Sequence, residues 1–514
     1  MKHYLTVGVS LMASGVAAGF APSAQAFNFN PVNLVVATTT YSGANNASGT
    51  PLKVGDPLAT VVGTSGPVSA GTANADGSVT KVFNNASVDA NFGVTSQIFL
   101  QQITTNGSPI STLAVPTSQA VSSFSSKSEL GLNLSQDGHS LTFMGYNAPV
   151  NSTQDVSNSY TPGVTPIPKG YSVTPNYREI VSVDANGTIT TTNTNAFAGN
   201  NGRAAVTARN GVTYMVGNAD SSTQASVSSG LQMTTGPAVG GVTPTTQVGS
   251  FNAKLVDTSL TTDKAAKDNN FRGLTISDNK LFFTKGSGGS GIDSVYTVTS
   301  NVAGNLPTAS GQAISILKGF PTTAATAQNN PGSPFLPFGL FFANSTTLYV
   351  ADEGNKALGS AALQADTYAG LQKWSLMSGT WMLDYTLTNG LGIGMDETIS
   401  GNPTGAEAYG EVQTAGLRNI TGKVNGDGTV SLFATTSTGS NSADQGADPN
   451  RLVAITDTLS AMTLPGSATF TTLMGAQYGQ RIGGVAFAPV PEPASLALLG
   501  AGVAGLGLVR RRRG

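Results

Sequence analysis

Four arginines share a position that could bind an anion. Each stands at the start of an apolar stretch, and they are Arg203, Arg272, Arg418 and Arg481. A guanidinium group carries five N–H donors in a planar fork that fits carboxylates. If the apolar stretches are strands that begin around one axis, the four side chains could bind an anionic sugar or carboxylate. Alternatively, each arginine hydrogen-bonds carbonyls of a neighbouring element or pairs with an acid such as Asp352 or Glu353.

Residues that could catalyse a reaction are few. His139 is the one histidine beyond the first three residues, and it lies beside Asp137-Gly138, a turn sequence. A Ser-His-Asp triad would need this histidine, and no G-x-S-x-G sequence stands in a strand–turn–helix context. Acids for a glycosidase-type carboxylate pair are available, and the ones to examine are Asp352, Glu353, Asp384 and Asp396. We expect a noncatalytic protein, with a secreted propeller enzyme acting on glycans or lactones as the alternative.

Metal chemistry has little support in the sequence. The chain has no cysteine, which excludes Cys-based zinc sites, iron–sulfur clusters and thiol nucleophiles. Residues 74–78, 184–188 and 425–429 resemble fragments of calcium loops but lack the full twelve-residue pattern. Each also lies where a hairpin turn is expected. We therefore expect no cofactor, with calcium as a possible exception.

The elements that position these residues are predicted to be β-hairpins. Two apolar stretches flank each of five turns, at 137–138, 210–211, 278–279, near Asn344, and at 427–428. Asp-Gly and Asn-Gly supply the positive φ angles that tight hairpin turns require. The turns follow one another after about 73, 68, 66 and 83 residues. Between them we expect second hairpins, with turns at 186–187 and 378–379 and within 294–306 and 450–464.

Two hairpins per unit make four strands, and radially packed four-stranded units form a β-propeller. The last unit, residues 480–489, has one strand, which residues 33–41 and 94–116 could complete. We predict an all-β protein, a single β-propeller of six or seven four-stranded blades closed by N-terminal and C-terminal strands. Residues 338–355 resemble one repeat of the NHL-type propellers. A sandwich array or β-solenoid fits the period less well, and residues 217–247 and 402–415 are expected to be surface loops.

The composition favours a globular protein that does not bind nucleic acid. Only 10% of the residues are charged and the net charge is −2, with no basic patch. Hydrophobic residues make up 39% of the chain, too many for a wholly disordered protein.

The N-terminus has the pattern of a signal peptide. A short basic start precedes an apolar run over residues 5–20 and the small-x-small sequence Ala24-Gln25-Ala26. We predict a signal peptide over residues 1–26 that directs the chain to the Sec export machinery. Residues 27–489 are then the exported, propeller-like body.

The C-terminus combines a short motif, an apolar run and a charge cluster. The motif is Pro491-Glu492-Pro493, and residues 494–509 are apolar or small. As a helix this run would extend about 24 Å, short for a hydrocarbon core of about 30 Å. The cluster that follows consists of Arg510, Arg511, Arg512 and Arg513. Because arginines stay on the cytoplasmic side, we predict a short C-terminal transmembrane helix.

These three features, in this order, resemble the PEP-CTERM sorting signal of Gram-negative bacteria that make exopolysaccharide. The resemblance covers residues 490–514. It implies that exosortase, a membrane enzyme, reads the Pro-Glu-Pro motif and that the tail is removed. It further implies an inner-membrane precursor whose body then passes to the cell surface or the extracellular matrix.

The sequence therefore predicts an exported surface or matrix protein. We expect it to associate with extracellular polysaccharide, in biofilm or in adhesion. An ice-binding surface protein is another alternative, because the chain is rich in threonine, although no T-x-T array of fixed period is present.

Overall fold

The structure of the protein is a computed structural model. It describes residues 27–40, 42, 61–63, 66–68, 95–123, 126, 128–150, 156–162, 175–219, 228–235, 242–286, 290–324, 334–355, 360–402, 412–440, 448–475 and 477–492. The predicted signal peptide, the predicted span over residues 494–509 and the arginines that follow lie outside these residues. Within the described ranges, no helix is long and apolar enough to cross a membrane.

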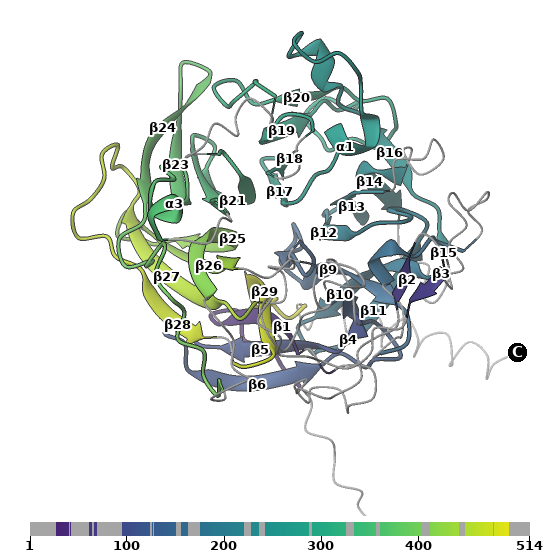
Figure 1. The fold of residues 1–514 in the computed structure, drawn as a ribbon, viewed down its shortest axis with the longest axis horizontal. Coiled ribbons are helices and arrows are strands. Elements are labelled where there is room, and N and C mark those ends of the chain that lie inside the picture. The colour runs from purple at the N-terminus through teal and green to yellow at the C-terminus, as the bar shows by residue number, and fades with distance from the viewer. Residues whose placement is uncertain are drawn as a thin grey trace, which may run out of the picture.

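Six β-sheets stand around a common axis as the blades of a propeller (Figure 1). Four of them follow the chain from the axis outward. They are β12 (Gly202–Thr207), β13 (Val212–Gly217), β14 (Gly230–Thr235) and β16 (Thr246–Gly249); β17 (Leu274–Ser277), β18 (Lys280–Lys285), β19 (Ser294–Val298) and β20 (Ile314–Ile316); β21 (Pro337–Asn344), β22 (Thr347–Asp352), β23 (Gly370–Met377) and β24 (Thr380–Leu387); and β25 (Val412–Val424), β26 (Thr429–Ser440), β27 (Arg451–Thr458) and β28 (Thr471–Gly475).

The fifth blade has a short inner strand and one added outer strand. It contains β8 (Asn133–Leu134), β9 (Ser140–Asn147), β10 (Tyr177–Asp184), β11 (Ile189–Thr194) and β15 (Val242–Thr243). Outside the blades lie the pairs β2 (Val61–Gly63) with β3 (Gly66–Val68) and β4 (Thr95–Ser96) with β7 (Ser122–Ser123). The helical segments are α1 (Ala265–Asp268), α3 (Ser360–Gln364), η2 (Val156–Asn158) and η5 (Ala253–Leu255).

The sixth blade joins the two ends of the body. Its order is β29 (Gln480–Phe487), β1 (Leu34–Thr40), β5 (Ile98–Ile103) and β6 (Pro109–Ala114). Strand β29 pairs with β1 in antiparallel register, from Leu34 opposite Phe487 to Thr40 opposite Gln480. The predicted closure by terminal strands is thus confirmed. The propeller has six blades rather than seven, because the N-terminal strands complete the C-terminal blade.

The predicted turns connect the first and second strands of the blades. Asp278 and Asn279 have φ angles of 46° and 55°, and Gly138 and Gly211 have 82° and 81°. These left-handed conformations suit Asn, Asp and Gly, which explains the turn sequences. Residues 338–355, which resemble an NHL-type repeat, form most of the hairpin of β21 and β22.

Three expectations about connections were wrong in whole or in part. Residues 217–247 contain β14, β15 and the start of β16 rather than one surface loop. Of the loop expected over residues 402–415, residues 412–415 belong to β25, and residues 403–411 lie outside the described residues. The hairpins predicted within 294–306 and 450–464 have longer connections, because β20 begins at Ile314 and β28 at Thr471. The residues after β19 and β27 form long loops before the next strand of each blade, β20 or β28, begins.

The strand order gives the propeller two unlike faces. Short turns between inner and second strands, at 135–139, 208–211, 278–279, 345–346 and 425–428, lie on one face, which we call the turn face. The inner strands begin at the other face, which also carries the connections between second and third strands. The described residues of those connections are 148–150, 156–162, 175–176, 218–219, 228–229, 286, 290–293, 353–355, 360–369 and 448–450, and we call this side the loop face.

The hydrophobic core lies between adjacent blades. One cluster joins the β12–β16 and β17–β20 blades, and its rings Phe271 and Phe283 have centroids 4.6 Å apart. Near the axis the inner strands approach so closely that a Cβ on Gly273 would lie 1.9 Å from the Phe338 carbonyl oxygen. Glycine is required there because backbone from the adjacent blade occupies the space.

Candidate functional site

The four predicted arginines lie around the axis near the loop face. Each belongs to an inner strand or directly precedes one: Arg203 is in β12, Arg272 precedes β17, Arg418 is in β25 and Arg481 is in β29. The other two inner strands, β8 and β21, have no arginine at this level. The ring of Phe338 in β21 lies 5.9 Å from the Arg272 guanidinium carbon. Only 2–5% of each arginine is exposed.

Two of the arginines hydrogen-bond backbone carbonyls of the next blade. Arg203 donates to the Phe271 carbonyl oxygen at 2.8 Å and to the side chain of Asn270. Arg481 donates to the carbonyl oxygens of Ser126 and, at 3.2 Å, Glu129. These bonds link neighbouring blades at their inner edges.

The other two arginines contact side chains across the axis region. Arg418 Nε lies 3.3 Å from a Glu353 carboxylate oxygen, and Glu353 is fully buried after β22 of the neighbouring blade. Arg272 donates to the hydroxyl of Ser128, a buried residue that precedes β8, two blades away. The axis therefore contains a network of buried charges that bridges the blades.

Glu129 is the acidic group of this network on the β8 side. Its carboxylate accepts hydrogen bonds from the Tyr146 hydroxyl, from Asn201 Nδ2 at 2.7 Å and from the Ser123 N–H at 3.0 Å. Burial raises the pKa of Glu129, although these hydrogen bonds and the charge of Arg481 act in the opposite direction.

Burial also acts on the cations. It lowers the pKa of Arg203, and the neighbouring Arg272 lowers it further, whereas Glu129 and Glu353 oppose both effects. Burial lowers the pKa of Arg272 as well, with Glu353 opposing and Arg418 contributing. Two carboxylates thus offset part of the repulsion among the cations. These contacts agree with the alternative in which each arginine bonds to carbonyls of a neighbouring element or pairs with an acid. Binding of an external anion at the axis stays a prediction.

The structure separates most of the acids considered for catalysis. Asp352 is fully buried and accepts bonds from the N–H groups of Leu336 at 2.8 Å and Gly354 at 2.9 Å. Burial raises its pKa, and the nearby Asp366 raises it further. Asp384 lies on the outermost strand β24, where the Ser375 hydroxyl donates to it at 2.6 Å. Asp396 precedes β25 and accepts a bond from Gln413 at 3.0 Å.

Two of the calcium-like sequences form hydrogen-bonded turns. Asp184 accepts bonds from the N–H groups of Asn186 and Thr188 at 2.9 and 2.8 Å. Asp427 accepts bonds from the N–H and hydroxyl of Thr429 at 3.0 and 2.7 Å. Residues 74–78 lie outside the described residues. In the part of the chain that the structure describes, no group of three or more Asp, Glu or His side chains could hold a metal ion.

A cavity of about 310 Å³ opens in the axial channel nearer the turn face, beyond the arginines. All six inner strands contribute to its wall, which has apolar side chains at Leu132, Val206, Leu340 and Ile420. Asn133, Ser135, Gln136, Thr275 and Thr421 add polar groups. The channel is thus charged toward the loop face, and toward the turn face it is uncharged with mixed polar and apolar groups.

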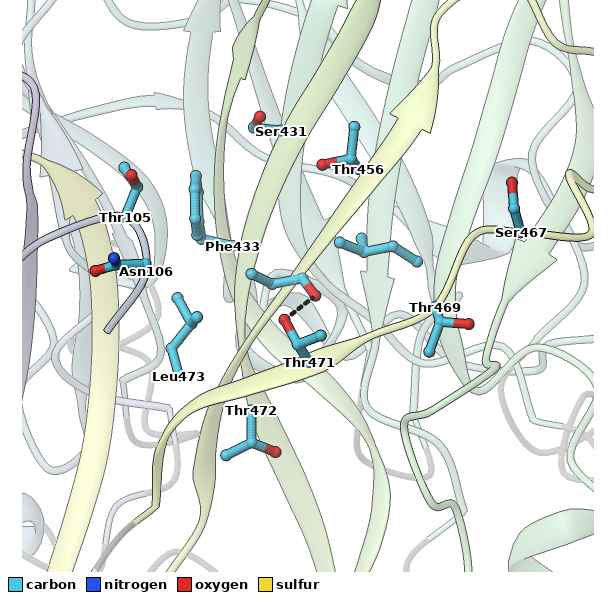
Figure 2. A pocket seen from close by; sticks show the side chains of 12 residues that line it. Thr105, Asn106, Ser431, Phe433, Thr456, Ser467, Thr469, Thr471, Thr472 and Leu473 are labelled. Atoms are coloured by element: carbon cyan, nitrogen blue, oxygen red, sulfur yellow. Dashed lines mark hydrogen bonds between the residues drawn. The ribbon is translucent and has the colours of Figure 1, made fainter. Parts of the chain in front are cut away.

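A second pocket, of about 560 Å³, lies on the flank of the propeller between the β25–β28 blade and the closing blade (Figure 2). Its apolar lining includes the side chains of Phe433 and Leu473. Hydroxyl and amide groups line it as well, contributed by Thr105, Asn106, Ser431, Thr456, Ser467, Thr469, Thr471 and Thr472. No titratable side chain lines it. We call this pocket the hydroxyl groove.

Sequence reasoning missed the hydroxyl groove and the role of Glu129. The groove joins Thr105 and Asn106 of one hairpin to strands more than 300 residues later, and no local pattern encodes that contact. Glu129 stands in an ordinary polar stretch, so nothing in its neighbourhood marked it as the partner of Arg481.

The C-terminal motif begins directly at the folded body. Val490, Pro491 and Glu492 are exposed after β29. Residues 489–513 match the family model of the PEP-CTERM protein-sorting motif. The chain carries a PEP-CTERM sorting signal. This signal implies export, a membrane-anchored precursor and processing by exosortase.

Solved structures with similar chains are distant. A quinonprotein alcohol dehydrogenase-like protein from Bacteroides thetaiotaomicron is 8% identical with a TM-score of 0.29, over 77% of this chain and 85% of that one. A Synechocystis apocarotenoid oxygenase mutant is 8% identical with a TM-score of 0.36, over 90% and 94%. No curated protein matches the chain. The chain is therefore identified by its PEP-CTERM signal, and its fold is assigned from the sheet topology described above.

Proposed function

We propose that the body is a noncatalytic surface or matrix protein that binds extracellular polysaccharide through the hydroxyl groove. The groove carries the proposal, because it is large enough for a few sugar residues and combines hydroxyl groups with the apolar side chains of Phe433 and Leu473. Neutral sugars present hydroxyls and apolar C–H faces, which such a surface complements. The sorting signal supports the location, since it implies that the body is exported.

The buried charges support a structural role for the axis. Arg203 and Arg481 donate to backbone carbonyls, and Arg418 pairs with Glu353. Because these N–H groups already have internal acceptors, an anionic sugar would have to compete with them, although Arg203 Nε and Arg418 Nη2 have no hydrogen-bond partner among the described residues. We therefore propose a neutral ligand at the groove rather than an acidic one at the axis.

Co-sedimentation of residues 27–490 with exopolysaccharide from the producing organism tests this function. We expect binding that changes little with salt, because the groove is uncharged. The double variant Thr456→Val/Thr471→Val removes two hydroxyl groups at nearly constant volume. If each contributes about 1 kcal/mol, binding should weaken by roughly tenfold or more.

Thr386→Val is the matched control, since Thr386 lies on β24 of another blade and lines no part of the groove. Binding that is lost in Arg272→Ala/Arg418→Ala, falls steeply with salt and survives the threonine changes would place an acidic glycan at the axis instead. Absence of co-sedimentation at any salt concentration would overturn the proposal.

A further inference from the structure

Both ends of the folded body leave from the turn face, beside the β8–β11 blade. Near the N-terminal end, the Phe29 N–H donates to the Ala185 carbonyl at 2.8 Å, in the turn between β10 and β11. Near the C-terminal end, the Val490 N–H donates to the Gly138 carbonyl at 2.8 Å, in the turn between β8 and β9. Two neighbouring turns of one blade therefore hold the two ends.

The body is docked up to the residue before the sorting motif. The Ala488 N–H donates to the Asn33 carbonyl at 3.0 Å, and His139 Nδ1 lies 2.8 Å from the Val490 carbonyl oxygen. Only residues 491–493 separate Val490 from the predicted start of the membrane span at Ala494. Because an extended chain advances at most about 3.6 Å per residue, the two points are within about 15 Å. The tail is too short to let the body turn over.

Large apolar side chains are exposed on the same face. They lie in or beside its turns and terminal segments, at Val32, Ile110, Val302, Met377, Val424, Met462, Leu464 and Val490. Val32 and Leu464 are 62% and 56% exposed. Single exposed apolar residues are ordinary on soluble surfaces, and the loop side also exposes Leu255 and Met395, at 81% and 63%. Eight of the fourteen large exposed apolar side chains among the described residues nevertheless lie on the turn face, where the tail starts.

The turn face carries a small excess of negative charge. Asp137, Asp184, Asp278 and Asp427 stand in its turns and Glu492 follows Val490, whereas Arg209, Lys280 and Lys423 lie in or beside the turns. Anionic lipid headgroups would therefore repel this face weakly rather than attract it. Contact of the turn face with a bilayer therefore depends on the short tail and on the apolar side chains.

We propose that the turn face rests on the membrane bilayer in the tail-bearing precursor, with the loop face directed away from it. The exposed apolar side chains enter the headgroup region, as apolar side chains of interfacial segments do. The arginine-containing end of the axis then points outward. This arrangement depends on the sorting tail and not on polysaccharide binding.

The lack of cysteine makes the orientation measurable on the full chain. Single variants carry one fluorescent label each, at Met462→Cys or Val424→Cys on the turn face and at Leu255→Cys or Met395→Cys on the loop side. The labelled chains are reconstituted into phosphatidylethanolamine–phosphatidylglycerol vesicles that contain a headgroup spin-labelled lipid, a contact-range quencher. All four residues are exposed, so the fold should tolerate the changes, which the urea midpoint verifies.

We expect at least about twofold stronger quenching at the two turn-face positions than at the two loop-side positions, because lipid contact ends within the headgroup layer. Equal quenching at all four positions, or stronger quenching on the loop side, would overturn the orientation. Failure of the full chain to float with the vesicles would overturn it together with the membrane anchor. Neither result would bear on co-sedimentation of residues 27–490 with polysaccharide.

Discussion

At the scale of single residues, Arg418 and Glu353 form a buried ion pair between two blades. Arg418→Met would remove the cation that pairs directly with the fully buried Glu353 carboxylate and leave the charges of Arg272 and Arg203 nearby. Breaking a buried pair on one side typically costs about 3–5 kcal/mol. We expect a loss of that size in the free energy of unfolding, measured by urea denaturation.

Lys423→Met is the control for that change, because Lys423 lies on the same strand, β25, but is exposed. Its effect should stay within about 0.5 kcal/mol. A loss below about 1 kcal/mol in Arg418→Met would mean that the pair contributes little and that Arg418 is available for another partner.

Glu179 on β10 makes stability depend on pH. Only 2% of its surface is exposed, and burial raises its pKa to about 7, against a hydrogen bond from Thr191 that lowers it. The folded state thus keeps a proton that the unfolded state releases between about pH 4.5 and 7. This contribution to stability is complete below that window and is lost as the pH rises through it, by an amount on the order of 3 kcal/mol.

Glu179→Gln should therefore stabilise the protein at about pH 8 and change little at about pH 4. Urea unfolding at both pH values measures the effect. Glu492→Gln, at an exposed position after β29, is the matched control. A variant of Glu179 with the same profile as the unchanged protein would contradict the assignment.

At the scale of elements, Gly273 determines how closely two inner strands can approach. A Cβ at this position would lie 1.9 Å from the Phe338 carbonyl oxygen, which the adjacent blade holds in place. Gly273→Ala must separate β17 from β21, and such overpacking costs about 3 kcal/mol or more where nothing can yield. The thermal midpoint should fall accordingly.

Gly426→Ala is the matching change in open space, since no atom lies within 4 Å of its Cβ position. It should alter the unfolding free energy by about 0.5 kcal/mol or less. Equal effects of the two alanines would show that the inner strands are packed more loosely than described.

The turns and strands were more predictable from the sequence than the residues that they contact in other parts of the chain. Turns such as Asp278-Asn279 need positive φ, which few residues tolerate, so they are visible locally. The positions of the arginines at the inner strands followed from those turns. Their partners did not, because Arg481 meets Ser126 and Glu129 more than 350 residues away along the chain. Strand β14 was missed because residues 217–247 lack a recognisable hairpin turn.

At the scale of the whole molecule, the two faces of the propeller carry different parts of the chain. The turn face carries both ends of the folded body and the start of the sorting signal, whereas the loop face carries the described parts of the longer connections. The hydroxyl groove opens on the flank, lined by residues at the turn-face ends of β26, β27 and β28. If the turn face lies on the membrane in the precursor, the groove becomes fully accessible only after the tail is removed.

Closure of the ring by β29 gives the last prediction. This strand supplies the inner edge of the sixth blade, and its Ile482 and Val485 are buried in a cluster with Leu34 and Val36 of β1. A chain of residues 27–479 lacks the strand, so β1 loses its partner and the ring stays open. We expect it to lose cooperative unfolding in urea, followed by circular dichroism.

A chain of residues 27–490 is the control, because it keeps β29 and the docked residues up to Val490. It should unfold in one cooperative transition at the same urea midpoint as the full-length chain in detergent. Removal of the tail would then release an intact propeller, as processing beyond Val490 requires. If residues 27–479 also unfolded cooperatively at that midpoint, the terminal strand would not be what closes the ring.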